Sequence, residues 1–562
     1  MSLTAWEAVI LNRAGTPKDS ERGMQLNWFL VFGIALVTIA CGVGFVGSLL
    51  LTASPSLAPL SEHVTIWHLF APGRTLMTCL ALASGIAYAL IAILVARKAS
   101  LIPERGFVTA LALAALAFGL CWIATNATEH NGFSDSAQLL AYARQLAHGD
   151  MSSFLPHSES FANKLPGDMY LSNYPYQGGI LLLLEGCSRM FGDFDVQAFQ
   201  VLNALCCVGT SLLLVRASVI NGRPKPERLL SALLSLTLFA PLLFVVFPYG
   251  NTIGLFLALL AMSLWERSRG AAGAARMAFV ALGFVLLCLG LAVKSTYVVI
   301  AIGYLVVLLI DCLRKRDGAW GIAFAILLVV ATRLSGAVPQ AVIEARLGYE
   351  LPANQPKTAW IAMGLSNESV LGQDMPGWWS TSALDSQIGS EGDVAAMSRD
   401  AQDSISMSLD TFANDPSYAA WFFAKKLGTE WLDPSFQSLY IAGCGIMRAD
   451  SQGRTHADDG RFDPADATLP HGLACRALEC VMDGQQSVIY LGATIGGAAL
   501  VAEARKKRAK TLEFALPCAA FMGFVVYTLW EAKGMYTLPF FLCLIPLAAR
   551  GFATLASRAR KH

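Results

Sequence analysis

The chain is dominated by apolar runs about as long as a lipid bilayer is thick. A bilayer-spanning helix needs about 20 mostly apolar residues, and the sequence contains thirteen apolar runs, several of them shorter than that. These runs predict an all-α polytopic membrane protein with 12–13 transmembrane helices, an extracytoplasmic insert domain and juxtamembrane helices. The runs are 27–52, 75–96, 107–124, 176–192, 196–217, 228–247, 251–266, 276–293, 295–312, 318–339, 485–502, 511–530 and 536–556.

Composition supports this prediction and excludes other classes of protein. Of the 562 residues, 55% are hydrophobic and only 14% are charged, whereas a soluble globular protein has about 25% charged residues. The formal net charge of +1 gives no indication of a nucleic-acid partner. The 13 cysteines form no CxxC pair and no Cys/His ligand spacing, so we expect no zinc site.

The basic residues predict the orientation in a cell membrane. Lys and Arg accumulate in the cytoplasmic loops of multi-pass proteins. The segments left on the outer face are 53–74, 125–175, the turn near 248–251, 340–484 and 531–535. We place both termini in the cytoplasm, together with the clusters Arg13/Lys18/Arg22, Arg97/Lys98/Arg105, Arg223/Lys225/Arg228, Arg267/Arg269/Arg276, Arg314/Lys315/Arg316, Arg505 to Arg508 and Arg558/Arg560/Lys561.

One stretch conflicts with this orientation. Two apolar runs lie between the outer loop that ends near 175 and the inner loop near 220, where an odd number of crossings is required. The run 176–192 is short and begins with Gln177 and two glycines. Either it is a partial or re-entrant helix, or one inside assignment is wrong.

Four regions follow from this organisation. They are a cytoplasmic N-terminal segment (1–26), an N-terminal transmembrane module with a catalytic outer loop (27–339, loop 125–175), an extracytoplasmic domain (340–484), and C-terminal helices with a basic cytoplasmic tail (485–562). The extracytoplasmic domain holds 20 acidic and 9 basic residues.

Two further expectations concern the extracytoplasmic domain. Within it, 415–433 carries aromatic residues on one face and Lys425/Lys426 on another, which predicts a helix lying in the membrane interface. If the compartment is oxidising, one disulfide among Cys444, Cys475 and Cys480 is possible, for example between Cys475 and Cys480.

The loop 125–175 contains a second predicted interfacial helix, from Ser134 to His148. Ser134 is a suitable N-cap residue, and Asp135 then lies in the first turn, close to the membrane surface. The apolar face of the helix consists of Leu139, Leu140, Ala143 and Leu146.

Acidic and basic residues at the outer ends of the spans suggest transfer chemistry. Moving a group from a lipid-phosphate donor to a hydroxyl acceptor needs one carboxylate to take the hydroxyl proton. It also needs cationic or hydrogen-bonding groups that hold the departing phosphate. The candidate carboxylates are Asp135, Glu129 and Asp168, and the candidate phosphate partners include His130 and Lys533.

The order of these features resembles the membrane glycosyltransferases of the GT-C fold, which use polyprenyl-phosphate sugars. An Asp at the start of a juxtamembrane helix is followed by a Tyr/Pro-rich entry to the next span, an outer turn, a long outer loop, and a last outer turn with acid, base and tyrosine. Here these pieces are Asp135; Tyr170, Asn173, Tyr174, Pro175, Tyr176 and Gln177; Phe247, Pro248, Tyr249, Gly250 and Asn251; Trp360, Met363 and Gly364; and Glu531, Lys533 and Tyr536.

The resemblance implies an inverting transfer of a monosaccharide from a polyprenyl-phosphate donor to a cell-envelope glycan or lipid-linked acceptor on the outer face. It implies that Asp135 is the general base and that no metal or other cofactor is needed. However, Asp135 stands alone between serines where the family often has paired acids, which leaves a divalent metal open. The implied substrate-binding residues are Glu129, His130, Asp168, Tyr174, Tyr176, Gln177, Tyr249, Lys294, Glu531, Lys533 and Tyr536.

Other interpretations stay open at the level of sequence. The chain could be a flippase or transporter of lipid-linked sugars, a polymerase or ligase of lipid-linked oligosaccharides, or a non-catalytic membrane subunit. For single residues, Asp135 could simply favour the helix dipole, and Lys294 could snorkel to the interface. Glu531 and Lys533 could form an exposed ion pair of little energetic value, and Tyr174 to Gln177 could belong to an aromatic belt.

Overall fold

The protein is a bundle of long helices with two short β-hairpins. The computed structural model describes residues 17–55, 64–68, 75–126, 134–151, 154, 170–314, 318–368, 375–444, 447–449, 455–457, 473–506 and 510–558. The hairpins are antiparallel and pair β1 (Leu51–Pro55) with β2 (Val64–His68), and β3 (Met447–Ala449) with β4 (Thr455–Ala457).

The prediction of a multi-pass membrane protein is confirmed. Within the described residues, 9 helical stretches are long and apolar enough to cross a bilayer. The number rises to 11 if two bent pairs each count as one span, namely Lys225–Leu236 with Phe239–Val246 and Gly534–Leu542 with Ile545–Arg558. The nine stretches are Trp28–Leu50, Thr75–Arg97, Glu104–Thr125, Pro175–Ile220, Gly273–Val293, Ser295–Arg314, Gly318–Leu347, Arg476–Arg505 and Thr511–Leu529.

This number is lower than the 12–13 expected, although each of the thirteen apolar runs forms helix. Two of the runs do not count as separate spans. Helix α8 (Gly178–Phe191) has 14 residues, or about 21 Å, which is shorter than the roughly 30 Å of a bilayer core. It continues through a short 3-10 turn into α9 (Asp195–Ile220). Its shortness favours the partial-helix explanation of the crossing conflict.

Helix α12 (Asn251–Ser268) is the second run that is not counted. It has 18 residues, begins with Asn251 and carries Glu266 and Arg267 in its last turn. These polar ends lower its mean hydropathy below that of the counted spans. It packs closely against α13 (Gly273–Val293). Helix α12 therefore belongs to the bundle, although it is not among the counted spans.

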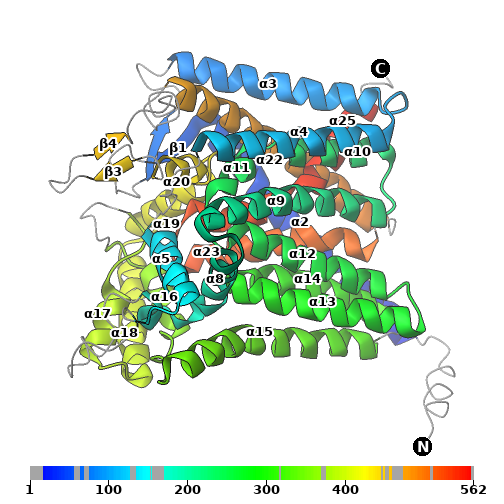
Figure 1. The fold of residues 1–562 in the computed structure, drawn as a ribbon. Helices are drawn as coiled ribbons and strands as arrows, with labels where there is room; N and C mark the ends of the chain where they lie inside the picture. The colour runs from blue at the N-terminus through cyan, green and yellow to red at the C-terminus, as the bar shows by residue number, and fades with distance from the viewer. Residues whose placement is uncertain are drawn as a thin grey trace, which may run out of the picture.

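The two ends of the bundle differ in what they carry (Figure 1). One end holds α5 (Ser134–His148), both β-hairpins and the helices of the insert. The opposite end holds the turns between α3 (Thr75–Arg97) and α4 (Glu104–Asn126), and between α12 and α13. Helix α25 (Ile545–Arg558) also ends there. The basic residues of these turns therefore gather at the end away from α5.

The insert is shorter than 340–484, because the helices on either side of it extend further than the apolar runs. Helix α15 (Gly318–Leu347) continues past residue 339, and α22 (Leu473–Arg505) begins before residue 485. Between them the described helices are α16 (Lys357–Gly364), α17 (Ser382–Gly389), α18 (Val394–Asn414), α19 (Pro416–Trp431) and α20 (Ser438–Cys444).

The predicted helix over 415–433 is present, but one of its faces was predicted wrongly. Helix α19 is capped by Asp415, whose carboxylate accepts from the Tyr418 N–H at 2.9 Å. Lys425 lies over the Trp421 ring at 5.2 Å. Lys426, which was expected on the polar face, is 0% exposed. Its ammonium donates to backbone carbonyls inside the protein, because three carbonyl oxygens converge there.

The suggested Cys475–Cys480 disulfide is also wrong. Cys480 is buried and its thiol donates to the sulfur of Met77 at 3.5 Å, while the side chains of Cys444 and Cys475 lie outside the described residues. Both Cys475 and Cys480 belong to α22, five positions apart. Neighbouring side chains on a helix are three or four positions apart, so this pair does not share a face.

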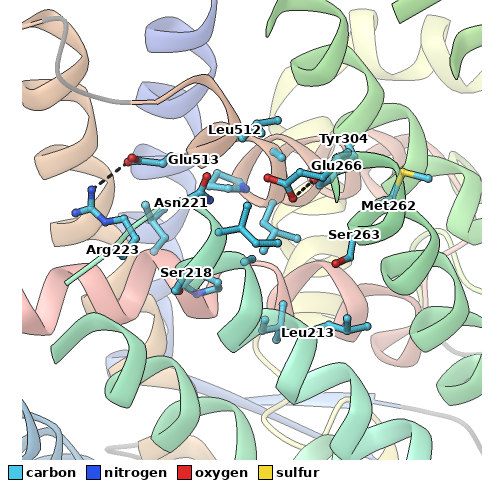
Figure 2. Close-up of a pocket in the computed structure, with 18 of the residues that line it drawn as sticks. Leu213, Ser218, Asn221, Arg223, Met262, Ser263, Glu266, Tyr304, Leu512 and Glu513 are labelled. Atoms are coloured by element: carbon cyan, nitrogen blue, oxygen red, sulfur yellow. Dashed lines mark hydrogen bonds and ion pairs between the residues drawn. The ribbon is translucent and has the colours of Figure 1, made fainter. Parts of the chain in front are cut away.

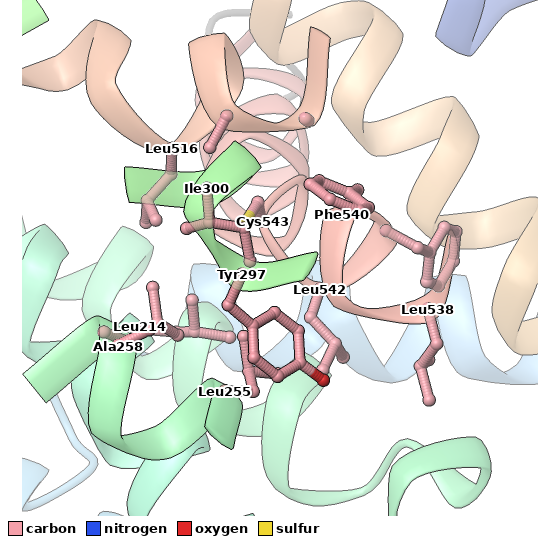
Figure 3. Packing of buried hydrophobic residues seen from close by; sticks show 14 of the residues in the cluster. Leu214, Leu255, Ala258, Tyr297, Ile300, Leu516, Leu538, Phe540, Leu542 and Cys543 are labelled. Carbon is pink, nitrogen blue, oxygen red and sulfur yellow. The ribbon is translucent and has the colours of Figure 1, made fainter. Parts of the chain in front are cut away.

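The apolar core reaches α5, because it includes Leu139 and Leu140 of that helix. Figure 3 shows Tyr297 of this core, which lies among Leu255 of α12 and Leu542 of α24 (Gly534–Leu542) and is 3% exposed. Its hydroxyl donates to the carbonyl of Asn251 at 2.5 Å. This bond joins the start of α12 to the short helix η5 (Ser295–Tyr297), so the core holds the two segments in a fixed relation.

Candidate functional site

Asp135 lies in the first turn of α5, as the sequence predicts, and the structure shows that it is half-buried. The helix has the predicted bounds, and its apolar face is buried, because Leu139, Leu140, Ala143 and Leu146 are each at most 6% exposed. A carboxylate in this position also favours the helix dipole. The burial of the apolar face therefore fixes where Asp135 lies at the end of the bundle.

Ionic contacts anchor α5 on α8 and α9. Arg144 donates twice to the carboxylate of Asp195, at 2.8 Å from both Nε and Nη2, and the Ser188 hydroxyl donates to the same carboxylate at 2.7 Å. Arg189 donates to the carbonyl of Leu146 at 2.9 Å. Such bidentate pairs constrain geometry, so the helix that carries Asp135 is held at both its polar and apolar faces.

The Tyr/Pro-rich entry contacts the turn before α12. Pro175 starts the short helix η2 (Pro175–Gln177), and the Gln177 amide donates to the Tyr249 hydroxyl. Gly250 allows the turn to approach α13 closely, because a Cβ at this position would clash with the carbonyl of Val293. The turn that carries Tyr249 is thereby brought against Lys294.

Lys294 lies between α13 and η5, with its ammonium over aromatic rings. The Nζ atom is 4.4 Å from the ring centroid of Tyr249 and 5.3 Å from that of Tyr536, which are cation–π distances. Burial lowers the pKa of Lys294 to about 8, although the nearby carboxylates of Asp135 and Glu531 act in the opposite direction. The ammonium is therefore still mostly protonated at neutral pH.

Glu531 and Lys533 lie in the turn between α23 (Ala515–Leu529) and α24 and are buried. They are 3% and 6% exposed, so the interpretation as an exposed ion pair of little value is wrong. The N–H of Ala532, between them, donates to the carbonyl of Gly377 at 2.7 Å. The turn is thus attached to the insert as well as to the bundle.

Two tryptophans near these residues were not recognised as site residues from the sequence. Trp360 of α16 and Trp530 at the end of α23 are half-buried, with near-parallel rings 6.5 Å apart. Trp360 also contacts Tyr174 at 6.4 Å and Tyr176 at 6.2 Å. The resemblance includes Trp360 in its pattern, but no local signal in the sequence pairs it with Trp530.

Nine of the twelve residues expected at the site gather at this end of the bundle. The Tyr536 hydroxyl, for example, interacts electrostatically with Glu531, Tyr249, Asp135 and Tyr176. Glu129, His130 and Asp168 lie outside the described residues. The nine are Asp135, Tyr174, Tyr176, Gln177, Tyr249, Lys294, Glu531, Lys533 and Tyr536.

No cluster suited to a metal ion occurs in the part of the chain that the structure describes. No group of three or more His, Cys, Asp or Glu side chains is placed to share an ion there. Asp135 and Glu531 are the described carboxylates near Lys294, and Lys533 lies with them. These two carboxylates and two lysines could exchange protons with a ligand and bind an anion.

A polar pocket lies in another part of the bundle (Figure 2). It lies between α9, α12, α23 and α25, and its wall includes Arg223, Glu227 and Glu513. Its charges are paired, since Arg223 contacts Glu227 at 2.7 Å and Glu513 at 3.3 Å. The Tyr304 hydroxyl donates to Glu266 at 2.6 Å. These contacts stabilise helix packing, so we do not assign the chemistry to this pocket.

Comparison with known proteins identifies no relative. The chain matches no protein family, no curated protein and no solved structure. A functional assignment therefore depends on the residues that gather near Asp135 and Lys294.

Proposed function

We propose that the protein is an integral membrane glycosyltransferase that moves a monosaccharide from a polyprenyl-phosphate donor to a hydroxyl of a cell-envelope glycan or lipid-linked acceptor. The observation that supports this proposal is the gathering of one half-buried carboxylate, Asp135, with Lys294 and the buried pair Glu531 and Lys533. These groups come from three separate parts of the chain. They supply a general base and a cationic phosphate site side by side.

Asp135 is the proposed general base. It would take the proton of the acceptor hydroxyl while the hydroxyl oxygen attacks the anomeric carbon and the bond between this carbon and the phosphate oxygen breaks. The configuration inverts, and the polyprenyl phosphate leaves with the electron pair of the broken bond. A positioned base typically contributes about 10²–10⁴-fold to the rate.

Lys294 and Lys533 are the proposed partners of the leaving phosphate. Among the described residues, the Lys294 ammonium makes no hydrogen bond or ion pair, and it is held instead by the faces of Tyr249 and Tyr536. Its N–H donors are therefore free to bind phosphate oxygens. Fixed cationic donors at a partly buried site stabilise developing negative charge more strongly than the same donors in water.

The proposed site faces the outside of the cell. It lies at the end of the bundle that carries α5, opposite the turns rich in Lys and Arg. Because basic loops remain cytoplasmic, this orientation supports a donor and an acceptor that meet on the extracytoplasmic face. The termini would then be cytoplasmic.

The test compares cell-envelope glycans of strains that carry the wild-type protein, no protein, Asp135→Asn, or Asp410→Asn at equal membrane levels. Asp410 is an exposed acid on α18 and serves as the matched control. We expect the null and Asp135→Asn strains to lose the same sugar and the Asp410→Asn strain to keep it.

Two other outcomes would contradict the proposal. If the null strain keeps all its glycans, the protein is not a transferase of the cell envelope. If the null strain loses a sugar that Asp135→Asn retains, Asp135 is not the base, and transport of the lipid-linked sugar without chemistry becomes the better explanation.

A further inference from the structure

We infer that Trp360, Trp530, Tyr174 and Tyr176 form an aromatic platform that binds the sugar ring of the donor by stacking. The inference rests on the proposed function and adds the part of the site that recognises the sugar. The four side chains come from the segment before α8, from α16 in the insert and from the end of α23. We refer to these four residues as the aromatic platform.

The rings of the platform contact one another around Trp360. Its centroid is 6.2 Å from that of Tyr176, 6.4 Å from that of Tyr174 and 6.5 Å from that of Trp530. The two indoles are inclined by only 12°. All four side chains are half-buried, so each has part of its surface available for a ligand.

A sugar ring would lie on the platform rather than between the indoles. Carbon atoms in contact are about 3.5–4.0 Å apart, so a ring held between two indoles would need roughly 7–8 Å. The indole centroids are 6.5 Å apart. The stacked pair therefore has no room for a ring between the indoles, and a sugar can place its C–H face against an outer face of the pair.

The charged groups lie beside this surface, where the polar edge of a sugar would be. Tyr174 interacts electrostatically with Asp135, Glu531 and Lys533. Tyr176 interacts with Glu531 and Asp135 as well. A site with an apolar wall and a few convergent polar groups is typical of small-molecule recognition. The donor sugar would cover the platform. Its phosphate would then lie towards Lys533, and its anomeric carbon would lie within reach of an acceptor hydroxyl bound to the base Asp135.

A buried lysine holds the two tryptophans in place. The Lys426 ammonium donates to the carbonyl of Gly364 at 2.6 Å and to that of Trp530 at 2.7 Å. Gly364 ends α16, one turn after Trp360, and a Cβ there would clash with the backbone of Leu529 and Trp530. The close approach of α16 to the end of α23 is therefore built into the fold, and it fixes the ring pair.

An aromatic belt at the membrane interface is the alternative role for such residues. Belt residues anchor separate helices to the lipid headgroups. In this protein the four rings contact each other and adjoin the charged residues of the candidate site. This arrangement favours a sugar over a lipid as the occupant.

The test measures binding of geranyl phosphate and of geranyl phosphate linked to mannose, glucose or arabinose by the full-length protein in nanodiscs. For the wild type, we expect at least one conjugate to bind about tenfold more tightly than geranyl phosphate. Trp360→Leu and Trp530→Leu should each reduce this ratio about 2- to 10-fold, which corresponds to roughly 0.5–1.5 kcal/mol per ring contact. The affinity for geranyl phosphate itself should stay within about twofold.

Matched variants separate the sugar site from the phosphate site. Trp421→Leu removes a tryptophan of α19 that is 38% exposed and should leave every affinity unchanged. Lys294→Ala should weaken geranyl phosphate and the conjugates equally. If Trp360→Leu does not fold, Trp360→Phe retains a smaller ring and should give a smaller reduction of the ratio in the same direction.

The outcomes distinguish the inference from the proposed function. An unchanged ratio in Trp360→Leu and Trp530→Leu would overturn the platform and leave the transferase proposal standing. Equal weakening of geranyl phosphate and the conjugates in these variants would assign the platform to the lipid and also overturn the inference. If the wild type binds neither class of probe, the proposed function fails and the inference falls with it.

Discussion

The candidate site and the polar pocket of Figure 2 both contain buried charges, but they differ in how the cations are held. In the pocket, Arg223 and Arg550 contact glutamates at 2.7–3.3 Å. At the candidate site, Lys294 has tyrosine rings as neighbours instead of a contacting carboxylate. Paired guanidinium groups join helices, whereas an ammonium over aromatic faces keeps its donors for a ligand.

Because the cations are held differently, we expect mutations in the two regions to affect different properties of the protein. Removing a charge from the pocket should reduce the stability of the whole protein. Removing the Lys294 ammonium from the candidate site should reduce binding or turnover with little loss of folded protein. The following predictions are ordered from the largest expected effect to the smallest.

Arg550→Leu should destabilise the protein by about 3 kcal/mol, because it takes the closer of two arginine partners from the buried carboxylate of Glu513. Arg550 is 4% exposed and donates to Glu513 at 2.8 Å. Thermal unfolding in detergent measures the change, with the exposed Arg505→Leu as the control. If the melting temperature of Arg550→Leu equals that of the wild type, the charges of the pocket do not stabilise the fold, and the contrast with the candidate site fails.

Lys294→Ala should weaken geranyl phosphate binding about 10- to 150-fold, which is the effect of losing roughly 1.5–3 kcal/mol of hydrogen bonding to a charged group. Stability should change little, because Lys294 makes no ion pair with a described residue. Isothermal titration in nanodiscs measures the affinity. The control is Lys357→Ala at the exposed start of α16. Equal affinities in both variants would place the phosphate elsewhere.

Lys426→Met should cost about 1–3 kcal/mol of stability, since backbone carbonyls lose their buried donor. The carbonyls are those of Gly364, Thr528 and Trp530. Lys425→Met, at the neighbouring position over the Trp421 ring, is the matched control. Denaturation curves of the two variants should differ, and coincident curves would show that the Lys426 contacts contribute little.

Geranyl phosphate affinity should be constant up to about pH 8 and then fall by up to tenfold per pH unit. Burial lowers the pKa of free Lys294 to about 8, and a bound phosphate would raise it. The cation therefore contributes fully below pH 8, and its contribution is lost as pH rises towards the pKa of the complex. Titrations between pH 7 and 9.5 avoid the second phosphate ionisation near 6. Lys294→Arg should remove the slope, and a slope that persists there would assign the titration to another group.

The sequence predicts the local features of the site but not how its residues come together. Helix α5 has its predicted bounds because its apolar residues recur at helical spacing. Gln177, Tyr249 and Lys294 were recognised one by one, and their contacts join positions 72 and 45 residues apart along the chain. Trp530 was missed because its partner Trp360 is far away in the sequence.

The sequence by itself determined that the chain crosses a membrane in helices and where most of these helices lie. Long apolar runs are costly in water, and their length matches a bilayer whatever their neighbours are. It also determined the position of α5, since the spacing of apolar residues reports directly on one helix face.

Only the tertiary structure decided which residues share the candidate site and which charges are satisfied elsewhere. Lys426 turns inward because three carbonyls from distant segments converge on it. Glu531 and Lys533 are buried because the insert covers their turn. The burial of these three side chains depends on close packing between elements that are remote along the chain. The local spacing of apolar residues does not predict such contacts.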